Sequence, residues 1–322
     1  MEILFALLTI IGLSMLEIVS SVDNAVINAD VLTNMSKRAR RWFLTWGILF
    51  AVFIVRGLLP FIIVYLLNPG LGFTGIISAT FSGDPMIVRA IEASAPPLLV
   101  GGGTFLIFLF FNWLFMQSKH YGLRGERYIH TKGIWFYAVV SILLCIIVWF
   151  SIHINPLMAF GAVVGSTAFF ITHGFKQNAE QKEREMLDNI HMSDWSKIMY
   201  LEVIDTTFSI DGVLGAFAFT LFVPLILIGN GIGAIVVRQI TMSNIENVKK
   251  YKYLKNGAMY SVGILGVIMI LESFGAHLPS WLSPIITIII IGYFFWKSKR
   301  ELDQQTNVVK NKNSISVKQY KE

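Results

Sequence analysis

Residues 16–26 read Leu16-Glu17-Ile18-Val19-Ser20-Ser21-Val22-Asp23-Asn24-Ala25-Val26 and follow an apolar run that begins at Ile3. A related stretch lies far downstream and reads Leu201-Glu202-Val203-Ile204-Asp205-Thr206-Thr207-Phe208-Ser209-Ile210-Asp211-Gly212-Val213. When the later aspartates are aligned, Glu17 falls on Asp205 and Asp23 falls on Asp211. Ionisable side chains inside membrane-spanning helices are costly and rare, so two such clusters predict a functional site.

The composition indicates a polytopic membrane protein. The chain has 322 residues, of which 55% are hydrophobic and 14% charged, and its mean hydropathy is +0.64. A soluble domain carries about a quarter charged residues. The net charge of +6 resides mostly in short segments between apolar runs, which favours a role in membrane topology over nucleic-acid binding. The lone Cys145 excludes a disulfide framework and a thiolate metal site.

Apolar stretches of about 20 residues predict membrane-spanning helices. The sequence contains about nine, at roughly 3–25, 42–66, 98–117, 134–151, 156–173, 196–216, 221–240, 257–274 and 281–297. Lysine and arginine follow each odd-numbered span, which predicts an N-terminus outside and a C-terminus in the cytoplasm. The polar tail, residues 301–322, is predicted to be a disordered cytoplasmic segment.

This topology predicts an inverted repeat of three helices plus three, because the two acidic clusters then lie on oppositely directed spans. Repeat one covers about 3–118, a connector about 134–195 and repeat two about 196–275. An extra helix at about 281–297 completes a transmembrane domain of residues 1–300. Arg56 and Arg238 strengthen the repeat, since each follows a glycine by nine residues in the next span.

The carboxylates of the two clusters cannot all stay ionised in a dry interior. They must protonate, pair with Arg56 or Arg238, or surround a cation. The arginines could instead only anchor in lipid. Oxygen ligands suit Mg, Ca or Mn, so a divalent cation is the first expectation and protons are the second.

Acids six residues apart on a straight helix differ by about 120° and about 9 Å. Either each helix breaks between its two acids, or the acids meet different neighbours. Local unwinding is favoured by small polar residues, among them Ser20, Ser21, Asn24 and Asn28 in the first cluster and Thr206, Thr207, Ser209 and Gly212 in the second.

The motifs Glu17-x5-Asp23-Asn24-Ala25 and Glu202-x2-Asp205-x5-Asp211, with Arg56, resemble those of the TerC-like integral membrane proteins, in the wider LysE-type exporter superfamily. The chain is similar to a less characterised branch, with Gly212 where a serine usually follows the second aspartate. The resemblance implies export of divalent metal, chiefly manganese, and a link to tellurite resistance. It also implies metal ligands at Glu17, Asp23, Asn24, Asp205 and Asp211.

We therefore expect an exporter of a divalent metal ion, with Mn²⁺ as its substrate, that works by alternating access in a bacterial cytoplasmic membrane. Glu202, Arg56, Arg238, Asn28, Thr206 and Ser209 would support the site. One alternative is an exporter of a cationic small molecule such as a basic amino acid. Another is a non-transporting membrane factor that helps load metal into exported enzymes. No enzyme activity is expected, because no Ser-His or zinc-type motif accompanies the acids.

Overall fold

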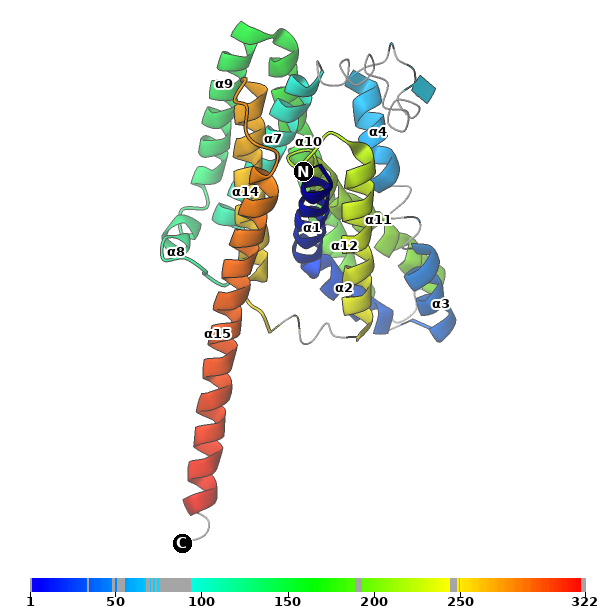
Figure 1. Cartoon of the computed structure of the whole chain (residues 1–322). Coiled ribbons are helices and arrows are strands. Elements are labelled where there is room, and N and C mark those ends of the chain that lie inside the picture. Colours follow the sequence, from blue (N-terminus) through cyan, green and yellow to red (C-terminus); the bar gives the residue numbers. More distant parts are fainter. Residues whose placement is uncertain are drawn as a thin grey trace.

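The computed structural model describes residues 2–33, 35–47, 50, 56–67, 70, 72, 74–75, 94–188, 193–243, 248 and 250–319, and this part of the chain is helical without strands (Figure 1). Within these described residues, seven helices are long and apolar enough to cross a membrane. They begin at Ile3, Ala95, Trp135, Pro156, Val223, Leu254 and Leu282. The prediction of an all-helical polytopic membrane protein is thus confirmed, while the count of nine spans stays a prediction.

The described helices follow in chain order, and the longest form a bundle (Figure 1). Their bounds are α1 Glu2–Ser20, α2 Val22–Thr33, α3 Lys37–Trp42, the π-helix η1 Phe43–Gly47, α4 Arg56–Leu67, α7 Ala95–Met116, α8 Glu126–His130, α9 Trp135–Ile154, α10 Pro156–Asp188, α11 Asp194–Ala216, α12 Val223–Ser243, α14 Leu254–Ser273 and α15 Leu282–Gln319.

Helix α7 is the most buried spanning helix and packs closely against α10 and α14. Glycines allow this approach. A Cβ atom built on Gly165 of α10 would lie 2.0 Å from the carbonyl oxygen of Gly101 in α7, and one on Gly103 of α7 would lie 2.8 Å from that of Gly266 in α14. Small residues at such contacts let helix backbones come together in membranes, where no hydrophobic force drives association.

Helices α1 and α11 run antiparallel where they meet. Gly212 of α11 faces Glu17 of α1, whereas Phe219, just beyond the C-terminal end of α11, lies against Gly12. Residue numbers therefore rise along one helix as they fall along the other. The pair α7 and α14 shows the same relation, because Gly103 lies near Gly266 and Phe110 lies near Gly263.

The first two predicted spans differ from the structure. Residues 3–25 divide at Ser21 into α1 and α2, although backbone bonds continue from Ser21 N to Glu17 O (3.1 Å) and from Ala25 N to Ser21 O (2.9 Å). The helix is thus interrupted without being unwound. Within 42–66, helix is described at Trp42, in η1 and in α4, and most of 48–55 lies outside the described residues.

Helix α11 is continuous from Asp194 to Ala216, so the break expected in the second cluster is wrong. One interior hydroxyl group bonds within the helix, because Ser209 Oγ donates to the carbonyl of Asp205 (2.5 Å). A hydroxyl group inside a helix can donate to a carbonyl of the preceding turn in this way, so it needs no unwound backbone as a partner.

Helix α15 continues to Gln319, where the sequence predicts a disordered tail. Its inner part is tied to the segment before α14 by an ion pair between Lys252 and Glu301 (2.8 Å) and by a bond from the Tyr253 N–H to Ser298 Oγ (2.9 Å). Extension of an existing helix costs little compared with nucleation, which explains why a polar tail follows the span as helix.

Candidate functional site

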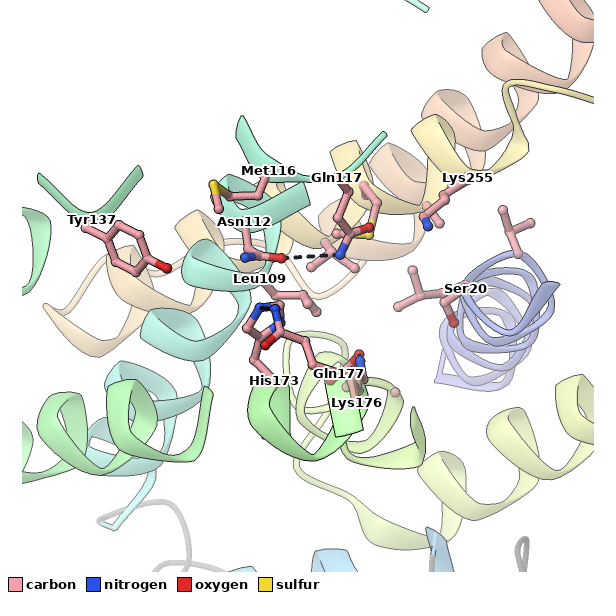
Figure 2. Close-up of a pocket in the computed structure, with 17 residues that line it drawn as sticks. Ser20, Leu109, Asn112, Met116, Gln117, Tyr137, His173, Lys176, Gln177 and Lys255 are labelled. Carbon is pink, nitrogen blue, oxygen red and sulfur yellow. Dashed lines mark hydrogen bonds and ion pairs between the residues drawn. The ribbon is translucent and has the colours of Figure 1, made fainter. Parts of the chain in front are cut away.

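A cavity of about 300 Å³ lies among the long helices, and Figure 2 shows its lining. Six helices and the residue after α7 contribute to its wall. The lining residues are Leu16, Val19, Ser20, Leu109, Asn112, Met116, Gln117, Tyr137, His173, Lys176, Gln177, Asp211, Gly212, Lys255, Ala258, Met259 and Val262. Polar groups thus converge on a partly apolar pocket, which is the usual character of a ligand site.

An ion pair between Lys176 of α10 and Asp211 of α11 forms part of the cavity wall. The side chains are 14% and 16% exposed. Asp211 Oδ2 accepts from the lysine, while its Oδ1 is buried and accepts no hydrogen bond from the described residues. Asp211 therefore keeps acceptor capacity beyond the bond to Lys176.

Amide and imidazole side chains line the same cavity (Figure 2). Gln117 Nε2 donates to Asn112 Oδ1 (3.2 Å), and Gln177 Nε2 lies 3.2 Å from His173 Nε2. Lys255 reaches the cavity from α14. These groups offer both donors and acceptors to a bound molecule.

Glu17 lies close to the wall formed by Asp211 and Gly212. Its side chain is 2% exposed, and Ser21 Oγ donates to its Oε1 (2.6 Å). A Cβ on Gly212 would lie 2.8 Å from Glu17 Oε2, and one on Gly233 of α12 would lie 2.6 Å from Glu17 Cβ. The glutamate thus fits between two glycines, and the first acidic cluster does meet the second.

Glu202 and Asp205 lie on α11 in a second polar region with Arg238 of α12. All three are buried, and Glu202 interacts electrostatically with the other two. Neither carboxylate oxygen of Glu202 accepts a hydrogen bond from the residues that the structure describes. The guanidinium of Arg238 lies over the ring of Phe43, 4.2 Å from its centroid. Arg238 is therefore packed inside the protein against Phe43.

The other predicted residues are placed as follows. Asp23 and Asn24 are in α2 and Arg56 begins α4, but their side chains lie outside those described. Asn28 is buried in α2 and Thr206 is half-buried in α11. The predicted ligand set therefore cannot be assembled in full from the described side chains, and its role stays a prediction.

Two metal-related observations follow from the described residues. Among them, no group of three or more His, Cys, Asp or Glu side chains lies close enough to hold a metal ion. Asp211, a predicted ligand, already holds the ammonium of Lys176.

Sequence reasoning missed the cations of the cavity. Lys176 and Lys255 follow apolar runs and were predicted to determine only topology. Lys176 follows His173 by three residues, so the two share a helix face. That spacing at the end of a span is the signal that could have identified the site.

A family model described as "Protein of unknown function (DUF475)" matches residues 22–305. A curated relative, the "Uncharacterized membrane protein YceF" of Bacillus subtilis (strain 168), is 30% identical over 100 residues, which is 31% of this chain and 38% of the relative. The chain thus spans less than two fifths of that relative's length. No solved structure matches.

The resemblance to the TerC-like proteins is wrong, because the family model that matches most of the chain is a different one. Two acids six residues apart in an apolar helix form a short pattern, and unrelated membrane proteins can acquire it whenever they need buried charge. Manganese handling and tellurite resistance lose the support that they drew from this resemblance.

Proposed function

We propose a transport function for this chain, which belongs to the family described as "Protein of unknown function (DUF475)". The protein carries a small polar solute across a bacterial cytoplasmic membrane. The cavity that contains Lys176 and Asp211 is its solute-binding site.

The observation that carries this proposal is the ion pair between Lys176 and Asp211 on a cavity wall. Removal of two charges from water costs several kcal/mol per ion, so a partly buried pair is weak evidence for stability. Ionisable groups that face a cavity within a helical membrane protein mark substrate pathways.

The antiparallel packing of α1 with α11, and of α7 with α14, supports alternating access through an inverted repeat. With the N-terminus outside, the cavity lies toward the cytoplasmic ends of α1 and α7. The solute then enters this conformation from the cytoplasm.

Flux into proteoliposomes tests the transport function. The purified full-length protein is reconstituted, and uptake of a radiolabelled amino-acid mixture, putrescine and Mn²⁺ is measured. We expect flux of at least one of these probes, and we expect its loss in Asp211→Asn and Lys176→Met. Lys299→Met alters an exposed lysine outside the cavity and should transport as the unmodified protein does. Flux no greater than in empty liposomes for all three probes would contradict transport.

The divalent-cation transport predicted from the sequence is the second candidate. The burial of Glu17, Glu202 and Asp205 on α1 and α11 favours it, since buried carboxylates must be compensated. Its distinguishing result is Mn²⁺ flux that is lost in Glu17→Gln and retained in Lys176→Met.

A further inference from the structure

We infer that the segment between α7 and α9 (residues 117–134) binds an anionic phospholipid at the membrane surface. Arg124 and Arg127 bind the phosphate of the headgroup, and exposed aromatic and aliphatic side chains beside them contact the rest of the lipid. Neither arginine lines the cavity, so this inference does not depend on the proposed transport function.

The position of the segment places it at a membrane surface. It connects α7 and α9, two of the helices that are long and apolar enough to cross a membrane, and Figure 1 shows its short helix α8 at the edge of the bundle. Backbone bonds fold it into successive turns, for example from Ile129 N to Gly125 O (3.1 Å) and from Trp135 N to Lys132 O (2.9 Å). Its side chains therefore stay close to the ends of the two spanning helices.

The exposed charges of the segment are all positive. Arg124, Arg127 and Lys132 are exposed, and none of the three forms an ion pair within the described part of the chain. The one acid of the segment, Glu126, is 1% exposed. The outer surface therefore attracts a negatively charged group and offers it no repulsion from a neighbouring carboxylate.

Glu126 is held inside the protein by four hydrogen bonds. Its carboxylate accepts from the backbone N–H groups of Gly122 (2.7 Å) and Leu123 (3.0 Å). It also accepts from Asn256 Nδ2 and Tyr260 Oη of α14, each at 3.0 Å. Each carboxylate oxygen accepts two of these bonds, so the acid is satisfied without either arginine. The same bonds anchor the segment to α14 and fix which of its faces is turned outward.

Two other charged groups at the segment are engaged elsewhere. Lys119 donates to the carbonyls of Trp113 (2.7 Å) and Leu114 (2.6 Å) at the end of α7. Glu301 of α15, an acid that interacts electrostatically with the segment, forms an ion pair with Lys252 (2.8 Å). The charge of the outer surface is thus determined by the three exposed cations.

Aromatic and aliphatic side chains flank these cations. Tyr128 is 70% exposed, Ile134 84% and Trp135 59%. Lys132 Nζ lies over the ring of Tyr128, 6.0 Å from its centroid. Tyrosine and tryptophan favour the headgroup level of a membrane, and arginine can bind a phosphate through two parallel hydrogen bonds. A phospholipid with a net negative charge offers a partner to both kinds of side chain.

Positive residues beside spanning helices also determine topology, and that role requires no bound lipid. Native mass spectrometry of the purified full-length protein in detergent separates the two roles. Apparent dissociation constants of the first bound lipid are measured for phosphatidylglycerol and for phosphatidylcholine, which has no net charge. We expect tighter binding of phosphatidylglycerol. Arg124→Gln and Arg127→Gln should each weaken it about fivefold, the usual contribution of one basic residue near an anionic membrane surface, and leave phosphatidylcholine unaffected.

The controls concern charge, fold and the source of the phosphate. Lys299→Met removes an exposed positive charge from α15 and should leave both affinities unchanged. Lysine at both arginine positions keeps the charge that determines topology and should retain more affinity than glutamine at both. Gel filtration establishes that each variant remains folded.

Inorganic phosphate should not displace the lipid, because it cannot contact the flanking side chains, and displacement would assign the surface to a free anion instead. Equal affinities of the wild-type protein for the two lipids would overturn the inference. An unchanged affinity for phosphatidylglycerol in the glutamine variants would overturn it as well.

Discussion

Gly212 shows how one residue without a side chain positions a charged neighbour. A Cβ at this position would lie 2.8 Å from Glu17 Oε2, so alanine would require the carboxylate to move. A Cβ on Gly233 would lie 2.6 Å from Glu17 Cβ and 2.7 Å from Glu17 Cγ, and Ser21 Oγ donates to Glu17 Oε1. Glycine at position 212 therefore leaves the space that the Glu17 carboxylate occupies beside the cavity.

Lys119, in the segment between α7 and α8, gives a pH prediction. Its ammonium donates to the carbonyls of Trp113 (2.7 Å) and Leu114 (2.6 Å). Burial nevertheless lowers the pKa of Lys119 from 10.5 to about 8. Glu126 opposes this shift, and Lys255 adds to it. Between these values the unfolded chain binds more protons than the folded one. Stability from this group therefore rises as the pH increases from about 8 to 10.5.

This pH dependence of stability is tested by thermal unfolding. Midpoints are measured from pH 7.5 to 10.5 for the wild-type protein and for Lys119→Met. The wild-type protein should gain stability relative to the variant across the window. A difference between the two proteins that stays constant or falls with pH would show that burial does not govern the titration of Lys119.

The individual acids were predictable from the sequence, but their partners were not. Glu17, Asp205 and Asp211 are identified by their charge within apolar runs. The pairing of Asp211 with Lys176 joins residues 35 positions apart on different helices, and helical periodicity carries no information on such a contact. The Glu17 contact with Gly212 depends likewise on how α1 and α11 approach each other.

At the scale of elements, the glycine contacts of α7 make a stability prediction. Gly165→Ala would bring a methyl group to 2.0 Å from the Gly101 carbonyl, which is backbone and cannot rotate away. Overpacking of this kind costs about 1–3 kcal/mol. We expect a lower unfolding midpoint in detergent.

Gly174→Ala is the matched control on the same helix, because a Cβ at Gly174 meets no atom within 4 Å. It should be neutral or stabilise α10 by about 1 kcal/mol, the difference in helix propensity between glycine and alanine. Equal midpoints for the two variants would mean that α7 and α10 are not in close contact.

Helix positions followed well from hydropathy, whereas helix ends did not. The predicted spans near 98–117 and 257–274 correspond to α7 and α14, since long apolar runs have few alternatives to a spanning helix. The interruption at Ser21 and the extension of α15 to Gln319 depend on local bonds and on contacts such as Lys252 with Glu301. Such contacts are set by the folded bundle.

At the scale of the whole molecule, labelling of one position tests the predicted orientation in the membrane. Gly125 lies between α7 and α8, and a Cβ there would meet no atom within 4 Å. The C-terminal ends of α1 and α7 line the same cavity, so these two helices run in the same direction. With an outside N-terminus, position 125 is therefore cytoplasmic, and in the opposite orientation it is outside.

Gly125→Cys in a Cys145→Ser background is therefore treated with a membrane-impermeant maleimide. We expect labelling in inside-out vesicles and none in intact cells. Labelling of intact cells would contradict the predicted orientation with an outside N-terminus. Cys145→Ser alone serves as the control for background reaction.

The packing of α7 has a mechanical consequence for the bundle. Glycine-to-carbonyl contacts pack α7 closely against α10 and α14, while α11 bears Asp211 at the cavity wall. The ion pair between Lys176 and Asp211 thus links these three helices to α11. Any movement of α11 away from α10 must break this bond, so the proposed transport function couples solute binding to displacement of α11.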